Sequence, residues 1–194
     1  MLGKQHAEFA VITTAALYIT LKDSSLEVFN YPAIVLATGL LGGLFPDIDL
    51  PVSIIGQIFP IASNITSKLF GHRTITHDLC ITGILAIISM ILFPYTIPFW
   101  FGYIGHLFLD SMTINGIWFL YPINKKYLKK HKIWELGLKN GIIRLFPTRY
   151  SFRSNQRSAK YISHLAAFLV SFIIITIPYI GKPDAIHQVL NFIY

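Results

Sequence analysis

The chain has 194 residues, of which 54% are hydrophobic and 13% charged, with a formal net charge of +7. This composition argues against an ordinary soluble domain, in which about a quarter of the residues are charged. The mean hydropathy of +0.57 favours lipid as the solvent for much of the surface over a soluble, unusually apolar helical protein. The single cysteine, Cys80, excludes an internal disulfide and a zinc ribbon, so any metal must be held by histidine and carboxylate side chains. Cys80 itself is expected to be a small buried residue of an apolar helix.

Apolar segments separated by short polar turns follow one another along the chain. They predict an all-α, multi-pass membrane protein with about four to five apolar helices, and Pro94 and Pro98 bracket a turn that predicts a helical hairpin over 79–120. Several segments are shorter than the ~20 residues that cross a bilayer, so some are expected to be re-entrant or interfacial. The first is expected to be a retained helix, because no small-residue cleavage site follows it. The segments cover residues 6–21, 31–45, 79–93, 98–120 and 161–181.

Basic residues concentrate toward the C-terminal end. Of the 16 Lys and Arg, 11 lie between Lys125 and Lys160, where Glu135 is the only acidic residue. The positive-inside rule predicts that this loop is cytoplasmic. The alternative, nucleic-acid binding by basic and aromatic side chains, is supported by no motif. The expected organisation is a helical membrane core with a metal site over 1–123, a basic cytoplasmic loop over 124–160, and a C-terminal membrane helix with a short tail over 161–194.

If the apolar segments cross a membrane in alternating directions and the basic loop is cytoplasmic, the ionisable side chains lie on the cytoplasmic side. If the loop is cytoplasmic, alternate segment ends face the cytoplasm, and these ends carry seven candidate ligands. The threading uses only hydropathy and the positions of Lys and Arg, so the convergence is an independent argument that the seven residues form one site. They are His6, Asp47, Asp49, His72, His77, His106 and Asp110.

Two of the motifs carry carboxylates. His106 and Asp110 are four residues apart in an apolar run, which places them on one helical face, where one ion can take both or where they hydrogen-bond to each other. The segment 45–51, FPDIDLP, sets Asp47 and Asp49 two residues apart in a proline-stiffened loop. Alternate side chains of an extended chain point the same way, which suits carboxylates that bind one or two cations, and the alternative is a pair of solvated residues at a helix end.

The segment 71–77, GHRTITH, adds two imidazoles and an arginine in front of an apolar helix. Thr76 can cap that helix, and Asp78 suits its positive first turn. Arg73 is placed to steady a phosphate or a developing oxyanion through bidentate contacts, or else to anchor a headgroup or pair with a carboxylate of segment 45–51. The remaining histidines, expected at the surface or at helix ends, are His131, His164 and His187.

Taken together, the motifs resemble the YdjM-like family of LexA-regulated, membrane-bound metal-dependent hydrolases. The resemblance implies a helical inner-membrane protein whose ligand pattern is similar to that of the zinc-dependent phospholipase C and single-strand nuclease superfamily. The matching pieces come in family order within about residues 1–123. They are His6, FPDID at 45–49, GHRxxTH at 71–77, GYxxHxxxD at 102–110, Met112-Thr113 and Tyr121-Pro122.

The resemblance also implies the roles of the candidate residues. Asp49 would be a ligand or a base, and Arg73 would stabilise charge on the substrate. Asp78 departs from the family, which often has a small polar residue there, and no second His-xxx-acid helix is evident. One to three divalent ions are therefore expected, zinc first and manganese as the alternative. The implied metal ligands are His6, Asp47, His72, His77, His106 and Asp110.

The function expected from these features is hydrolysis. Metal-activated water would attack a phosphoester of an anionic phospholipid or a lipid-linked phosphate at the cytoplasmic membrane face. The alternative is a non-enzymatic transport or metal-stabilised scaffold protein, but a transporter places its ligands at the bilayer midplane between repeats, and no repeat is present here. A third class, a DNA-repair nuclease suggested by the family's damage-linked regulation, would need the basic loop to present DNA, and nucleic acid is not an expected partner.

Overall fold

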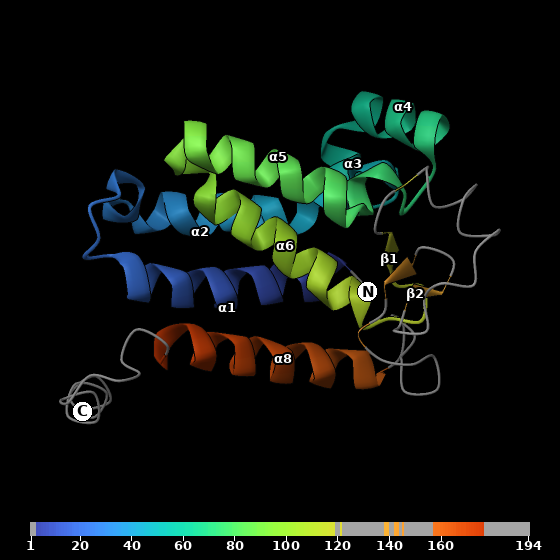
Figure 1. Cartoon of the computed structure of the whole chain (residues 1–194). Coiled ribbons are helices and arrows are strands. Elements are labelled where there is room, and N and C mark those ends of the chain that lie inside the picture. Colours follow the sequence, from blue (N-terminus) through green and yellow to red (C-terminus); the bar gives the residue numbers. More distant parts are fainter. Residues whose placement is uncertain are drawn as a thin grey trace.

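The computed structural model describes residues 3–118, 121, 138–139, 142–143, 145 and 157–176, which are mostly helical (Figure 1). The helices are α1 (Gly3–Leu21), α2 (Pro32–Leu44), α3 (Ile54–Ile58), α4 (Pro60–Phe70), α5 (Leu79–Leu92), α6 (Ile97–Ser111) and α8 (Arg157–Thr176). Short 3-10 turns lie at η1 (Glu27–Asn30), η2 (Phe45–Asp49), η3 (Ile75–His77) and η4 (Pro94–Thr96). The strands are β1 (Ile117–Trp118), β2 (Leu138–Lys139) and β3 (Ile142–Ile143).

Helices α1, α2, α6 and α8 lie side by side along one axis (Figure 1). Helix α2 packs most extensively on α6, and α1 contacts α2, α6 and α8. Helices α1, α5 and α8 run away from the end that carries the strands, whereas α2 and α6 run toward it (Figure 1). The start of α1, the end of α2, the segment before α5 and the end of α6 therefore meet at one end of the bundle, as the threading predicted.

Glycines allow α2 and α6 to approach closely. A Cβ atom on Gly42 would lie 1.9 Å from the carbonyl oxygen of Phe99, and one on Gly102 would lie 2.0 Å from that of Gly39. Real Cβ atoms essentially never come within 3.0 Å of another heavy atom. The two backbones are thus in direct contact, a packing mode that small residues provide between apolar helices.

The predicted hairpin over 79–120 is confirmed for α5 and α6, but the second helix ends at Ser111. The carbonyl of Asp110 accepts hydrogen bonds from both the backbone N–H and the hydroxyl of Thr113, at 3.0 and 2.7 Å, which closes the helix. Gly116 then adopts a φ of +66°, a conformation that favours glycine, and turns the chain into β1. The apolar residues beyond 111 misled the prediction because hydropathy does not distinguish a helix from a short buried strand.

Helices α3 and α4 were not predicted, although their starts have recognisable signals. The hydroxyl of Ser53 caps α3 by accepting from the N–H of Gly56 at 2.9 Å, and Pro60 occupies the first turn of α4. Both helices pack on the η2 turn. They were missed because their polar and apolar residues alternate over short stretches, without the continuous apolar run that marked the other segments.

The all-α prediction is wrong in one respect, because the described strands form a three-stranded antiparallel sheet in the order β1-β3-β2. Ile117 pairs with Ile143, and Trp118 pairs with Ile142. Strands of two residues carry too little alternating pattern to be predicted from sequence. Most of the basic loop over 124–160 lies outside the described residues, as do His131 and His187.

Among the described residues, two stretches have the length and hydropathy needed to cross a membrane, Pro32–Asp49 and Ser158–Thr176. Helix α5 is apolar but shorter, at 14 residues. The larger number of spans predicted from sequence stays a prediction. Cys80 in α5 is a free thiol and is half-buried rather than buried as predicted.

Candidate functional site

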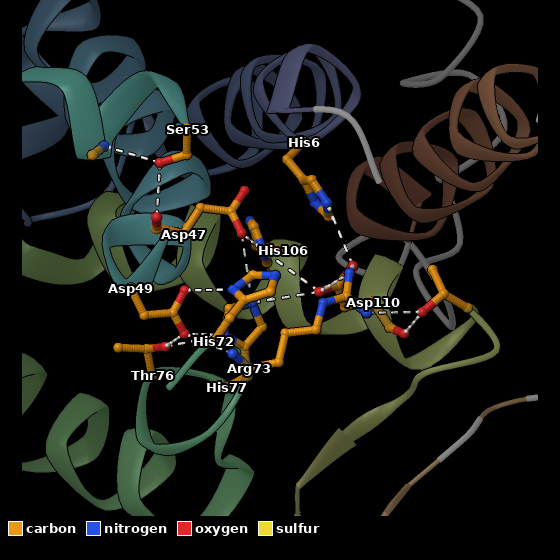
Figure 2. Close-up of polar contacts among 12 residues, drawn as sticks. His6, Asp47, Asp49, Ser53, His72, Arg73, Thr76, His77, His106 and Asp110 are labelled. Carbon is orange, nitrogen blue, oxygen red and sulfur yellow. Dashed lines mark hydrogen bonds and ion pairs between the residues drawn. The ribbon is translucent and has the colours of Figure 1, made fainter. Parts of the chain in front are cut away.

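The structure brings all seven predicted side chains together at the end of the bundle (Figure 2). They come from four segments that are far apart in sequence: α1, η2, the 71–77 segment and α6. All except His72 are buried, several of them completely. Ionisable groups of this kind are costly to bury unless they are paired or bind a cation, so their convergence calls for a functional explanation. The residues are His6, Asp47, Asp49, His72, His77, His106 and Asp110.

Two imidazole nitrogens and two carboxylate oxygens face one another at the centre of this cluster. Nε2 of His77 lies 3.8 Å from Oδ1 of Asp47 and 3.4 Å from Oδ2 of Asp110. Nε2 of His106 lies 3.7 Å from each of the same two oxygens. Zinc–ligand bonds of ~2.0–2.1 Å place neighbouring tetrahedral ligands about 3.3–3.4 Å apart. These nitrogen–oxygen separations are close to those around one ion, and Asp47, His77 and His106 form a group that could hold it.

The orientation of His106 is set by the backbone. Its Nδ1 lies 2.7 Å from the carbonyl oxygen of Gly43, an acceptor, so this nitrogen carries the proton and Nε2 carries the lone pair. Gly43 also packs closely on α1, where an added Cβ would lie 2.3 Å from that of Ala10. The sequence did not reveal this hydrogen bond, because its acceptor is a main-chain atom 63 residues away.

Within the described part of the chain, buried nitrogens of three histidines have no hydrogen-bond partner: both of His6 and the Nε2 atoms of His77 and His106. An unsatisfied buried polar atom costs about 1–3 kcal/mol. A bound cation would accept the one lone pair that each neutral imidazole carries and remove part of this cost. The donor set of imidazoles and carboxylates is one that zinc and manganese both accept.

His6 lies next to the four facing ligand atoms of Asp47, His77, His106 and Asp110. Its ring stacks on that of His106 with centroids 3.7 Å apart, and its Nε2 lies 3.5 Å from Oδ1 of Asp110. His6, His106 and Asp110 could together hold an ion, but His106 has only one lone pair to give. Among the described side chains, His6, His106 and Asp110 thus form a second possible group that shares His106 with the group of Asp47, His77 and His106.

Arg73 connects the 71–77 segment to α6. Its guanidinium lies 2.8 Å from the carboxylate of Asp110 and donates to the hydroxyl of Thr113 at 3.3 Å. One of the alternatives expected for this guanidinium was a carboxylate of segment 45–51, but Asp49 accepts from the backbone N–H of Arg73 instead, at 2.8 Å. Arg73 has a φ of +58°, which costs about 1–2 kcal/mol for a residue with a Cβ atom, and these contacts hold it there.

Asp49 organises the 71–77 segment. Its carboxylate accepts hydrogen bonds from Nδ1 of His72 at 2.7 Å, from the backbone N–H of Arg73 and from the hydroxyl of Thr76 at 2.6 Å (Figure 2). Thr76 was predicted to cap α5, but the cap is Asp78, which accepts from the N–H of Ile81. The contact between Thr76 and Asp49 was missed because a capping motif explained Thr76 locally.

The carboxylates change the proton affinity of His77. Burial by itself lowers the pKa of this imidazole, but contacts with Asp110 and Asp49 outweigh burial and raise the pKa to about 9. An excess of negative charge around a buried histidine is what a cation site presents before a cation replaces the proton.

A pocket of about 260 Å³ opens beside the cluster. His72 and Arg73 form one wall, and residues 115–118 with Ile142 form the rest. Because Arg73 also contacts Asp110, the pocket adjoins the ligands directly. The side chain of His72 is 37% exposed. His164 lies away from the site, in α8, with its Nε2 3.5 Å from the carboxylate of Glu8.

Comparison with known proteins places this architecture in a family. Residues 1–182 match the family model described as YdjM inner membrane protein. The uncharacterized protein YvsG of Bacillus subtilis (strain 168) is 37% identical over 126 residues, which cover 63% of this chain and 74% of YvsG. The inner membrane proteins YdjM of Escherichia coli (strain K12) and of Shigella flexneri are each 30% identical over 106 residues, which cover 48% of this chain.

The matched part spans about half of each YdjM protein, 52% of its length. No solved structure matches the chain. The family match extends 59 residues beyond the motifs that suggested it, from residue 123 to residue 182, and it includes both stretches that are long enough to cross a membrane. On this evidence the chain belongs to the YdjM inner membrane protein family.

Proposed function

We propose that this chain is a multi-pass, membrane-embedded metal-dependent hydrolase that cleaves a phosphoester of a lipid or another amphiphilic substrate at the cytoplasmic membrane face. The observation that carries the proposal is the buried set of four facing ligand atoms next to a pocket whose wall includes Arg73, which contacts Asp110. A metal ion with a purely structural role would need no pocket beside it, whereas a hydrolytic site needs a metal ion and a pocket for the substrate.

Four side chains would hold a divalent ion, and zinc is the first choice because two of the donors are imidazoles. An ion held there would lower the pKa of a bound water toward neutrality and polarise a phosphoryl oxygen. Arg73 orients the carboxylate of Asp110 and, from the pocket wall, can contact the phosphoryl oxygens of a substrate. The four side chains are Asp47, His77, His106 and Asp110.

The size of the pocket bears on the class of substrate. At about 260 Å³ it is smaller than the ~300–1,000 Å³ of sites for drug-sized ligands. It suits a small phosphoester headgroup, and the acyl chains of a lipid would lie outside it. Sequence supports the same class of substrate, because the basic loop over 124–160 would attract anionic headgroups at about 1 kcal/mol per Lys or Arg.

Helix α4 supports a lipid substrate because it exposes an apolar stripe next to the site. Ile61, Ile65 and Leu69 lie four residues apart on one helical face and are 77%, 53% and 68% exposed. The helix has 11 residues, too few to cross a bilayer, and it packs on the turn that carries Asp47. An amphipathic helix of this kind lies in the membrane interface, which would present the pocket to headgroups.

Hydrolysis by the purified protein tests this function. We expect zinc-loaded protein in detergent micelles to hydrolyse an anionic phospholipid or bis(4-nitrophenyl) phosphate, with release of product followed over time. Asp47→Asn should lower the rate by about 100-fold or more, because loss of a group that only supports a ligand already costs 10–100-fold. Asp23→Asn, at an exposed residue after α1, is the matched control and should leave the rate unchanged. A folded, metal-loaded wild type that hydrolyses no phosphoester would contradict the proposal and favour a metal-stabilised scaffold.

Metal affinity is expected to rise with pH. Because the pKa of His77 is raised to about 9 in the metal-free site, the ring carries a proton at neutral pH, and metal binding must displace it. The apparent affinity for zinc should therefore rise about tenfold per pH unit from about pH 6 to pH 8. Competition with a chromophoric chelator, corrected for the chelator's own protonation, measures this slope. An affinity that does not change with pH would exclude His77 as a ligand.

A further inference from the structure

His72 differs from the other histidines of the cluster in its surroundings. It is the exposed member of the set, and its ring forms part of the pocket wall. The other three histidines are at most 1% exposed. A side chain that faces the pocket is placed to meet a substrate rather than to complete a buried coordination shell.

The distance between His72 and Asp49 indicates a hydrogen bond rather than two ligands of one ion. Their Nδ1 and Oδ1 atoms are 2.7 Å apart, whereas two ligands of one tetrahedral zinc lie about 3.3–3.4 Å apart. The four nitrogen–oxygen separations among His77, His106, Asp47 and Asp110 are 3.4–3.8 Å, nearer to that value. The short contact therefore marks His72 and Asp49 as a hydrogen-bonded pair, although these two residues and Asp47 also form a group that could hold an ion.

Asp49 also determines which nitrogen of His72 can act. An ionised carboxylate only accepts hydrogen bonds, so Nδ1 of His72 must carry a proton and donate it. The backbone N–H of Arg73 and the hydroxyl of Thr76 bind the other oxygen of Asp49 at 2.8 and 2.6 Å, which keeps the carboxylate in place. The other ring nitrogen of His72, Nε2, is the one left to exchange a proton with a substrate in the pocket.

We propose that His72, oriented by Asp49, is the proton donor to the leaving oxygen of the phosphoester, and that neither residue is a metal ligand. Asp49 acts through His72 and is a positioning residue. The inference rests on the proposed hydrolytic function and assigns a role within that site.

The proton balance of the step is complete. Water attacks phosphorus, the bond between phosphorus and the alcohol oxygen breaks, and the proton on Nε2 of His72 passes to that oxygen, which leaves as the alcohol. The proton lost by the attacking water returns to His72 through solvent, so the cycle consumes one water and yields one alcohol and one phosphoester with one ester bond fewer. Asp49 accepts from Nδ1 and so holds the ring in one orientation during the transfer.

The test uses a variant that keeps the hydrogen bond but removes the donor. In His72→Asn the amide nitrogen takes the place of Nδ1 and can still donate to Asp49, so the 71–77 segment keeps its anchor. The two probes are phosphatidylglycerol in micelles, whose alkoxide leaving group needs a proton, and bis(4-nitrophenyl) phosphate, whose nitrophenolate does not. His164→Asn, at the exposed histidine of α8, is the matched control.

We expect His72→Asn to lose about 100-fold or more in rate on phosphatidylglycerol, since general acid catalysis contributes about 10²–10⁴-fold. Its rate on bis(4-nitrophenyl) phosphate should stay within about fivefold of wild type, and its zinc content by elemental analysis should equal that of wild type and of His164→Asn. This split between substrates is a signature that a purely structural role would not produce.

Three results would overturn the assignment. Loss of zinc in His72→Asn would make His72 a ligand, and equal losses on both probes would make its role structural. A wild type that binds zinc but turns over neither probe would refute the proposed function, and the role of His72 with it. The first two results refute the role of His72 alone, because they occur with an active wild type.

Discussion

The double variant His106→Ala/Asp110→Ala is expected to purify without the metal that wild-type protein retains in near-stoichiometric amount. It removes two of the four facing ligand atoms. One of them is Nε2 of His106, whose ring is oriented by the carbonyl of Gly43. Even loss of a supporting group costs about 10–100-fold in metal affinity, so loss of two ligands should reduce bound metal to background. Elemental analysis of detergent-purified protein that has never met a chelator measures the effect.

The matched control for this variant removes another contact between a histidine and a carboxylate. Glu8 and His164 are 3.5 Å apart on the surface between α1 and α8. The Glu8→Ala/His164→Ala variant should keep its metal, and circular dichroism should show the same helix content in both variants. Folded wild-type protein that carries no metal would rule out the metal centre and with it the hydrolytic function.

The second large effect is expected from Gly102→Leu. A Cβ atom at this residue would lie 2.0 Å from the carbonyl oxygen of Gly39, so the side chain would push α2 and α6 apart. Overpacking typically costs about 1–3 kcal/mol, and a clash against backbone on this scale should reach the upper end or prevent folding. Because the hydrogen bond between His106 and Gly43 spans the same two helices, metal should be lost together with stability.

Gly83→Leu is the control for this substitution. Gly83 lies in α5, and a Cβ atom added there would meet nothing within 4 Å. Replacing a helical glycine that has open space beside it favours the helix by up to about 1 kcal/mol, so this variant should be as stable as wild type or more so. Thermal unfolding in detergent, followed by circular dichroism, compares the two. Equal melting temperatures for both variants would show that close contact between α2 and α6 is not needed.

Local sequence patterns correctly indicated a large part of the architecture. The apolar runs marked α1, α2, α5, α6 and α8, because a continuous apolar run is a property of the segment itself. The four-residue spacing of His106 and Asp110 placed them on one helical face, and short turns between segments predicted which ends would meet. Amphipathic α4 and the two-residue strands were not predicted, because their patterns of polar and apolar residues are too short or too mixed.

The sequence by itself determined which side chains gather at one end of the bundle, since hydropathy, turn length and the positions of basic residues order the segments without any knowledge of contacts. Only the tertiary structure decided how these side chains are paired. Arg73 contacts Asp110 across 37 residues and His72 contacts Asp49 across 23, and the backbone of Arg73 has a positive φ. The separations among ligand atoms depend on how closely α2 and α6 pack at their glycines. Such distances arise between segments, and no single segment encodes them.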